Sequence, residues 1–588
     1  MDSKHVTEST SGQEDIQKTW WKEAIIYQIY PRSFQDSDGD GIGDLNGITS
    51  RLDYIQSLGV DIIWLNPTFL SPNDDNGYDI SDYREIMREF GTMEDFDRLL
   101  KEIHKREMRL VLDLVVNHTS DEHPWFEEAR KSRHNPYYNY YHWWPAEKGE
   151  PPLRLSYFDE EGNAWTYNKP TDSYYLHYFS RKQPDLNWEN PEVRQEIFDM
   201  MRFWFDKGID GFRMDSISLI AKDPSFPLID SKKYPDIFSF YAKEPRLHLY
   251  LHEMNRQVLS KYDCMSVGEG SAVMVDDVAK FVDPAREELN MLYHFDAARI
   301  RNTTLPDNPE SGIDYSLIAL KKMFTEWDKA IDKGWPSIYL GNHDQPRMVS
   351  RFGSDKDEFR ALSAKMLITF LLTMRGTPYW FAGDEIGMRN IRFDRIEDYN
   401  DIDTINRYKK AKAEGKDPQA VLDEQKETGR DNARTPFQWD RSPEAGFTAG
   451  TPWLKVNPDY TWINVADEEK DPTSILNYFK KVVSFRKENP SLIYGSYHLL
   501  DAENPQSYTF LRKTGADTYL IMLNFSHKAA ISTPGIDMSN AHVLLDNYGD
   551  RSHMAPQKDI TLRPFEAIVF QLNHPVYESF IDSLDLLE

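Results

Sequence analysis

Residues 211–220 read GFRMDSISLI, a mostly apolar run that predicts a short buried strand. Because side chains alternate between the two faces of a strand, Arg213 and Asp215 would share one face, and Phe212 and Met214 the other. An ionised pair on one face of a buried strand has two interpretations, a structural salt bridge or part of a functional site. The other strands of the chain help to decide between them.

Similar β-type runs recur at 25–31, 60–67, 108–117, 264–269, 336–344 and 378–385. Several are apolar on both faces, which is typical of strands inside a parallel sheet. Helical patterns such as 93–107 and 194–208 lie between them, and this alternation favours βαβ units. With the run at 209–215 there are seven clear strands, and a weak eighth near 292–295 completes an α/β fold, a (β/α)8 TIM barrel.

Two intervals depart from this alternation. The segment 121–190 holds 17 aromatic residues in 70, which indicates an irregular β-rich domain inserted after the third strand. Sugars stack on aromatic faces, although a small domain also needs aromatic residues for its own core, and we expect most of them to be core. Runs at 507–532 and 542–548 alternate at period two and predict a C-terminal antiparallel β-sandwich. We therefore expect a barrel over 16–118 and 191–495, the inserted domain over 119–190, the β-sandwich over 496–573 and an acidic tail over 574–588.

The 588-residue chain carries a formal net charge of −28. This charge argues against nucleic acid and against an anionic membrane surface as partners, so a small neutral substrate is expected. We also expect a monomeric protein. The single cysteine, Cys264, excludes an intrachain disulfide and zinc sites built on several cysteines. The polar N-terminus lacks the apolar core of a signal peptide, so we expect a cytoplasmic protein, or a periplasmic one if a signal has been removed.

Polar residues follow the predicted strands at their C-terminal ends, where TIM barrels build their active sites. They are Asn117, His118, Asp215, Glu269, His343 and Asp344. Cleavage of a glycoside needs one carboxylate near the anomeric carbon and one carboxylic acid that protonates the leaving oxygen. Any one of these acids alone could be a solvated loop residue, but three of them on one barrel rim favour catalysis. A cation at Arg213 would then keep Asp215 ionised.

In these residues the chain resembles the α-amylase superfamily, glycoside hydrolase family 13, and most closely its oligo-1,6-glucosidase, α-glucosidase and sucrose isomerase branch. The blocks that carry the resemblance are GVDIIWLNP (59–67), DLVVNH (113–118), QPDLNW (183–188), GFRMD (211–215), GEG (268–270) and NHD (342–344). The resemblance implies that Asp215 is the nucleophile, Glu269 the general acid/base and Asp344 the transition-state stabiliser. It also implies substrate-binding roles for Tyr78, His118, Phe179, Gln183, Arg213 and His343. No organic cofactor is expected.

The resemblance also bears on specificity. An Asp75–Arg434 pair would close the pocket around a terminal glucose, unless Arg434 is a surface ion pair, and would make the enzyme exo-acting. In relatives, valine after the nucleophile accompanies a preference for α-1,6 bonds and a small residue accompanies α-1,4 or sucrose activity, so Ser216 favours maltose-type or sucrose substrates. Gly341 departs from the family, since many relatives carry an acid before the Asn of NHD.

The stretch DSDGDGIGD (36–44) has the spacing of a calcium-binding loop. Asp36, Asp38 and Asp40 stand at positions one, three and five, Ile42 offers its carbonyl at seven, and Asp44 stands at nine. Position twelve is glycine, so the bidentate glutamate of an EF-hand is missing. Because related family members bind calcium or magnesium here, we expect a structural Ca²⁺, with Mg²⁺ possible; a metal-free turn is the alternative.

The function expected from the sequence is therefore a retaining exo-acting α-glucosidase that releases glucose from short α-glucosides. Alternatives are a sucrose isomerase or other transglucosylase that makes isomaltulose or trehalulose, and an oligo-1,6-glucosidase. Sucrose isomerases typically carry an RLDRD loop, where this chain reads AARIRNTT (297–304), which disfavours isomerisation. A non-enzymatic protein on an inactive scaffold of the family is disfavoured by the intact triad.

Overall fold

The GFRMD strand lies in a parallel sheet of eight strands in the computed structural model of the chain, which describes residues 18–158, 162–234, 236–515, 517–536, 538–551 and 558–572. The sheet order is β11-β10-β9-β5-β2-β1-β13-β12. The strands are β1 (Ile26–Ile29), β2 (Ile62–Leu65), β5 (Arg109–Val115), β9 (Gly211–Asp215), β10 (Met265–Glu269), β11 (Met291–Tyr293), β12 (Ser337–Ile338) and β13 (Thr377–Phe381). The two ends of this order meet where the Ser337 hydroxyl donates to the Leu292 carbonyl oxygen at 2.9 Å. The predicted (β/α)8 barrel is confirmed, including its weak strand.

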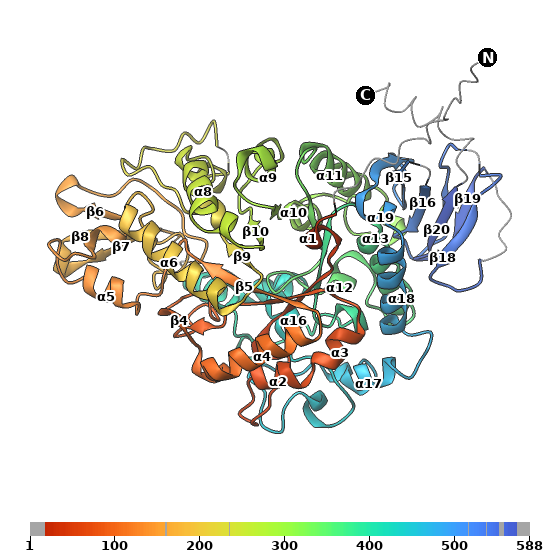
Figure 1. Ribbon diagram of the computed structural model, residues 1–588, viewed down its shortest axis with the longest axis horizontal. Coiled ribbons are helices and arrows are strands. Elements are labelled where there is room, and N and C mark those ends of the chain that lie inside the picture. Colours follow the sequence, from red (N-terminus) through yellow and green to blue (C-terminus); the bar gives the residue numbers. More distant parts are fainter. Residues whose placement is uncertain are drawn as a thin grey trace, which may run out of the picture.

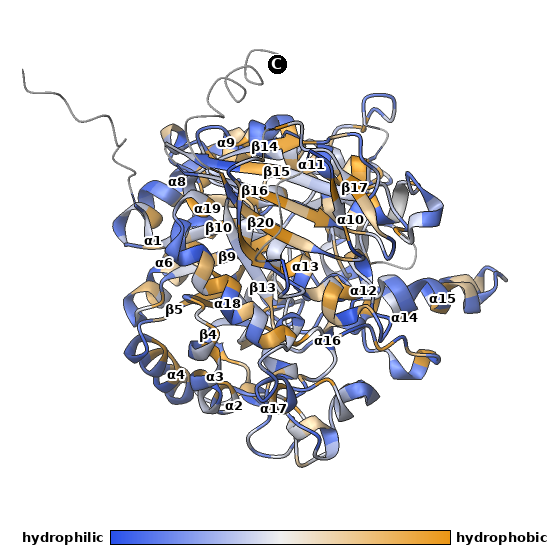
Figure 2. Ribbon diagram, turned by 90° about the vertical axis from the view of Figure 1, so that its right-hand side faces the viewer, coloured by the Kyte–Doolittle hydropathy of each residue, from blue (hydrophilic) through white to orange (hydrophobic). Residues whose placement is uncertain are grey.

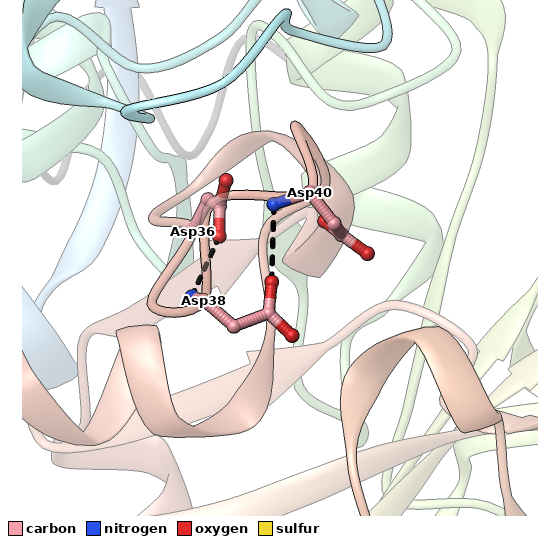
Figure 3. Close-up of side chains that lie close together, drawn as sticks. All are labelled: Asp36, Asp38 and Asp40. Carbon is pink, nitrogen blue, oxygen red and sulfur yellow. Dashed lines mark hydrogen bonds between the residues drawn. The ribbon is translucent and has the colours of Figure 1, made fainter.

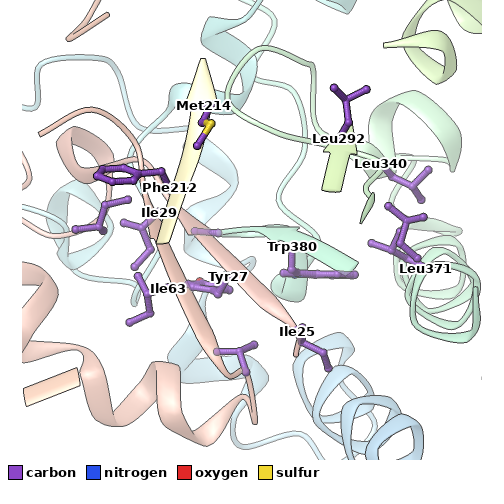
Figure 4. Close-up of a cluster of buried hydrophobic side chains, with 14 of the residues drawn as sticks. Ile25, Tyr27, Ile29, Ile63, Phe212, Met214, Leu292, Leu340, Leu371 and Trp380 are labelled. Atoms are coloured by element: carbon purple, nitrogen blue, oxygen red, sulfur yellow. The ribbon is translucent and has the colours of Figure 1, made fainter. Parts of the chain in front are cut away.

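The two faces of β9 separate as the alternation predicts. Phe212 and Met214 point away from the barrel axis into the large core beneath the helices (Figure 4). Arg213 and Asp215 point inward, where Trp64, Val267 and other apolar side chains fill the lower barrel. The charged pair is therefore held in the barrel interior, above an apolar floor.

Helices cover the outer face of the barrel (Figure 1). They include α4 (Met93–Lys105), α6 (Pro191–Lys207), α8 (Arg246–Gln257), α11 (Leu317–Ala330), α13 (Arg360–Thr373) and α18 (Ile475–Glu488). Local sequence sets their ends: Asn190 caps α6 by accepting from the Glu192 backbone N–H, and Gly208 ends the helix at φ 107°, a left-handed conformation that favours glycine. No helix in the described ranges is both long and apolar enough to cross a bilayer.

The inserted segment forms a small antiparallel sheet at one end of the molecule, opposite the C-terminal strands (Figure 1). Its strands are β6 (Trp143–Pro145), β7 (Trp165–Asn168) and β8 (Ser173–Leu176). Most of its aromatic side chains pack on one another, as Phe126 does on Trp143 with ring centroids 5.9 Å apart. Tyr157, Phe158 and Phe179 instead line a cavity that also contains Asp215 and Glu269, so the expected division between core and site holds.

The C-terminal part contains an antiparallel sheet of five strands. One face of this sheet packs against the barrel helices, and the other face packs against two short strands. The sheet order is β14 (Ser496–Leu500), β15 (Ser507–Thr514), β16 (Asp517–Asn524), β20 (Ala567–Leu572) and β18 (His542–Asp546), and the short pair is β17 (Ala530–Ser532) with β19 (Ile560–Leu562). Tyr508 packs on Phe370 of α13, whereas Leu520 and Ile568 pack with Ile560. Hydrophobic residues run along β16 and β20 in Figure 2. The predicted β-sandwich is confirmed, and the acidic tail at 574–588 lies outside the described residues.

Candidate active site

A cavity of about 280 Å³ opens at the C-terminal ends of the barrel strands and is walled on one side by the inserted domain. Eight of the predicted site residues line it: Asp75, Tyr78, His118, Phe179, Asp215, Ser216, Glu269 and Asp344. The other four predicted substrate-binding residues, Gln183, Arg213, His343 and Arg434, are fully buried behind this wall. The structure thus brings the three predicted catalytic acids together in one cavity.

Arg213 is the centre of the charge network beneath the cavity. Its Nη1 donates to Asp215 Oδ1 at 2.9 Å and to Asp113 Oδ1 at 2.6 Å. Its Nη2 donates to Glu269 Oε2, so one guanidinium bridges the two carboxyl groups predicted to perform catalysis. The Arg213–Asp215 pair is therefore more than an isolated structural salt bridge, because the same cation serves three buried acids.

The environment separates the proton affinities of the two bridged acids. Burial raises the pKa of Glu269 to about 8, with Arg213 opposing that effect and Asp215 adding to it. Burial also raises the pKa of Asp215, opposed by Arg213, but only to about 6. At neutral pH, Glu269 can therefore hold a proton while Asp215 is mainly ionised, as an acid and a nucleophile require.

Asp344 also lines the cavity and is held as a carboxylate. Arg434 Nη2 donates to its Oδ1 at 3.0 Å, and Arg430 Nη1 donates to the same oxygen at 3.2 Å. Burial alone would raise the pKa of Asp344, but His343 and these guanidinium groups outweigh burial and hold the pKa well below its usual range. The ring of Tyr78 stacks on His343 with centroids 5.3 Å apart, which fixes one side of the cavity.

The predicted partner of Asp75 needs a correction. Arg430, on the cavity wall, lies 3.5 Å from Asp75 Oδ1, whereas Arg434 is buried behind Asp344 and donates from its Nε to the His343 carbonyl oxygen at 2.9 Å. The expectation that Arg434 pairs with Asp75 is wrong. Arg430 directly precedes the short helix α16 (Asp431–Arg434) and Arg434 is its last residue. Their four-residue spacing puts both on one side of the helix and does not tell which is nearer the cavity.

Asp75 accepts a hydrogen bond from Gln183, which in turn contacts His118. Gln183 Nε2 donates to Asp75 Oδ2 at 3.1 Å and lies 3.2 Å from His118 Nε2. Burial raises the pKa of Asp75 to about 7 and lowers the pKa of His118 to about 3. His118 is thus a neutral imidazole at the pH where most enzymes work, suited to hydrogen bonding with hydroxyl groups.

Several site residues were not predicted from the sequence. They are Asp113 and Tyr293 on Arg213, and Tyr157, Phe158, Ser271, Ala272, Phe295, Arg299 and Arg430 on the cavity wall. Asp113 could have been found, because it begins the DLVVNH block and shares the inward face of its strand. Tyr293 ends the weak strand β11 and Arg299 lies in α10 (Asp296–Thr303). The remaining residues stand outside helices and strands, where alternation does not predict the direction of a side chain.

The predicted metal loop lies away from this cavity. One carboxylate oxygen from each of Asp36, Asp38 and Asp40 lies within 4.8 Å of the others (Figure 3). Asp44 instead accepts from the Gly47 backbone N–H at 2.7 Å and caps α2 (Leu45–Ser50). Ile42 donates its N–H to Asp40 at 2.8 Å.

The charges of this loop fit a divalent cation. Burial raises the pKa of Asp40, and the neighbouring carboxylates of Asp38 and Asp36 raise it further. A hard cation with oxygen ligands would relieve this repulsion. The structure brings together three of the five predicted ligands by their side chains, and places Asp44 in a capping hydrogen bond.

Comparison with known proteins agrees with this geometry. A family model described as the α-amylase catalytic domain matches residues 28–495. The oligo-1,6-glucosidase of Parageobacillus thermoglucosidasius is 51% identical, with 95% of this chain and 100% of that protein covered. An α-glucosidase of Pediococcus pentosaceus is 43% identical, with 94% and 99% covered. A crystal structure of a MutB mutant in complex with its substrate sucrose is 42% identical with a TM-score of 0.89, covering 94% of this chain and 99% of that one.

Proposed function

The chain belongs to the α-amylase family, glycoside hydrolase family 13, and from this premise we propose that it is a retaining, exo-acting α-glucosidase. It would release glucose from the non-reducing end of short α-glucosides. The observation that carries the proposal is the single Arg213 guanidinium, which holds Asp215 and Glu269 side by side with different proton affinities. In a retaining enzyme the two carboxyl groups must be about 5–5.5 Å apart, and a shared guanidinium favours such closeness.

The first half of the reaction would form a glucosyl-enzyme. The Asp215 carboxylate attacks the anomeric carbon, the bond from that carbon to the glycosidic oxygen breaks, and Glu269 gives its proton to the departing oxygen. In the second half, Glu269 takes a proton from water, the water oxygen attacks the anomeric carbon, and Asp215 leaves. Two inversions give net retention. Asp344, held as a carboxylate, would bind sugar hydroxyl groups through both halves.

The closed end of the cavity supports exo action. Asp75 and Arg430 form a charged wall that can hydrogen-bond the outer hydroxyl groups of a terminal glucose. A chain that continued beyond this glucose would have to displace the ion pair. We therefore expect release of single glucose units and no cleavage within starch.

The linkage preference depends on Ser216, which lines the cavity directly after Asp215. A small hydroxyl-bearing side chain there would admit the close second ring of a maltose-type or sucrose substrate. The second candidate is an oligo-1,6-glucosidase, which the 51% identity to an enzyme of that name favours. Sucrose isomerisation is the third candidate, since MutB, the solved structure in complex with sucrose, is a trehalulose synthase. Product analysis with maltose, isomaltose and sucrose separates them, because hydrolysis gives free glucose, whereas isomerisation gives isomaltulose or trehalulose.

We also propose that the Asp36–Asp40 loop holds a structural Ca²⁺, with Mg²⁺ as the alternative ion. The close carboxylates of Asp36, Asp38 and Asp40 support it. The ion would neutralise the turn and would supply no group to the cavity. A cytoplasmic location and a monomeric state remain predictions from the sequence.

A further inference from the structure

The two carboxylate oxygens of Glu269 have different surroundings. Oε2 faces the Arg213 guanidinium and accepts from the Tyr293 hydroxyl at 3.3 Å. Oε1 accepts from the Ser271 hydroxyl at 2.7 Å. A proton on Oε2 would compete with a cation, so the proton that Glu269 gives to a leaving group belongs on Oε1, beside Ser271.

The loop that carries Ser271 is closed by one internal turn and is bonded to two neighbouring segments. The Gly270 N–H donates to the Tyr293 carbonyl oxygen at 2.8 Å, and the Val273 N–H donates to the Gly270 carbonyl oxygen at 3.1 Å. The Ser218 hydroxyl donates to the Ser271 carbonyl oxygen at 2.6 Å. These bonds tie the end of β10 to β11 and to the turn after β9, so the Ser271 hydroxyl is held in place before substrate arrives.

Gly270 lies so close to β11 that a larger residue would not fit there. A Cβ at Gly270 would lie 2.6 Å from Leu292 Cδ2 and 2.9 Å from the Tyr293 carbonyl oxygen. The chain can follow β11 this closely only with glycine at that position. The close approach brings the next residue, Ser271, over the Glu269 carboxylate.

We propose that Ser271 is a positioning residue for the acid/base Glu269: its hydroxyl orients Oε1 toward the cleaved bond and stabilises the ionised carboxylate that must accept a proton from water. This inference rests on the proposed function, because it takes Glu269 as the acid/base. Ser271 itself makes and breaks no covalent bond.

The charges around Glu269 show why such a donor matters. Burial raises its pKa, and Asp215 and Asp344 raise it further, while Arg213 and the Ser271 hydrogen bond lower it. The other titratable groups that interact electrostatically with Glu269 are Asp113, Tyr157, Tyr293 and Tyr339, which favour its neutral form when they are ionised. A hydroxyl that donates to a carboxylate favours the charged form.

Loss of the Ser271 hydroxyl should therefore raise the pKa of Glu269 further. Glu269 would stay protonated to higher pH, so the basic limb of kcat/KM, which reports the protonated acid of the free enzyme, moves upward. The second half of the reaction needs the ionised form and would slow at neutral pH. The upward move of the basic limb distinguishes this role from a general loss of fold, which lowers activity at every pH without moving the limb.

The test compares the wild-type enzyme with Ser271→Ala and Ser271→Thr. We expect the basic limb of kcat/KM on maltose to rise by about one pH unit in Ser271→Ala, the shift that one charge-assisted hydrogen bond can cause, and to return toward wild type in Ser271→Thr. On an aryl α-glucoside with a good leaving group, Ser271→Ala should lower kcat and KM together at neutral pH, because the glucosyl-enzyme accumulates. If Ser271→Ala has a reduced melting temperature, Ser271→Gly, which also lacks the hydroxyl, is measured in its place.

A parallel Glu269→Gln variant tests the acid/base role of Glu269 separately from the positioning role of Ser271. If Glu269→Gln keeps most of its activity on maltose, Glu269 is not the acid/base, and both the proposed mechanism and this inference fail. If Glu269→Gln is inactive but the basic limb of folded Ser271→Ala coincides with that of the wild type, the positioning role is overturned and the proposed function stands. A limb that moves in Ser271→Ala and returns in Ser271→Thr supports the role.

Discussion

Replacement of Ser216 by valine tests how the cavity selects the linkage. Ser216 is 2% exposed and lines the cavity next to Asp215, where the second sugar ring of the substrate would enter. Valine adds methyl groups and removes a hydroxyl, so it should exclude a close second ring and tolerate the longer α-1,6 link. The expected change is about 1–2 kcal/mol in relative transition-state binding, or about 5–30-fold in the ratio of kcat/KM for isomaltose to that for maltose.

The backbone at Ser216 adds a cost that must be kept apart from this effect. Ser216 has φ 43° and ψ 32°, a left-handed conformation that β-branched side chains rarely adopt. Strain of about 1–3 kcal/mol should therefore lower the stability of Ser216→Val. Since it acts on the enzyme with either substrate, it cancels in the ratio of specificities.

The assay measures kcat/KM for maltose, sucrose and isomaltose in the wild type, Ser216→Val and Ser216→Thr. Threonine is branched like valine, so it carries a similar backbone strain but keeps the hydroxyl, and it is the matched control. We expect the wild type to prefer maltose or sucrose and the valine variant to shift toward isomaltose. A wild type that prefers isomaltose by about tenfold, or a valine variant with an unchanged ratio, would refute the role of Ser216.

Three further predictions follow from the site and the loop. Asp215→Asn is nearly isosteric and removes the nucleophilic charge, so turnover should almost vanish while the melting temperature is kept; a purified variant with substantial residual turnover would mean another nucleophile. Arg430→Ala should lower kcat/KM on maltose by about 10–100-fold through lost charge-assisted hydrogen bonds, whereas Arg441→Ala, at an exposed ion pair, should not; equal effects would remove Arg430 from the pocket wall. A chelator should lower the melting temperature by more than it lowers kcat at room temperature, because the Asp36–Asp40 loop lies away from the cavity, and an unchanged melting temperature would remove the proposed metal.

The barrel and its inward-facing charges could be predicted because strand alternation is a local property. The positions of Arg213 and Asp215 follow from a period of two, and the rim position of Glu269 and Asp344 follows from the ends of parallel strands. These rules need no knowledge of the rest of the chain. They predicted on which face of its strand each side chain lies and that it lies near the C-terminal end of the barrel, but they did not predict its hydrogen-bond partners.

The parts that could not be predicted depend on loops and on tertiary approach. Arg430 and Arg434 share one side of a short helix, and only the packing of that helix decides which one reaches Asp75. Asp44 was expected at a metal, yet the helix that begins after it takes its carboxylate as an N-cap. The role inferred for Ser271 depends on how closely Gly270 approaches β11, which no sequence pattern reports.

The stereochemistry of the first product tests the central claim most directly. Proton NMR, recorded from the moment enzyme is mixed with an α-glucoside and before mutarotation, distinguishes the two anomers of the released glucose. A nucleophilic Asp215 close to an acid/base Glu269, both on Arg213, predicts α-glucose as the first product, with β-glucose appearing only later by mutarotation. β-Glucose as the first product would contradict the account, because it requires a single displacement by water with no glucosyl-enzyme on Asp215.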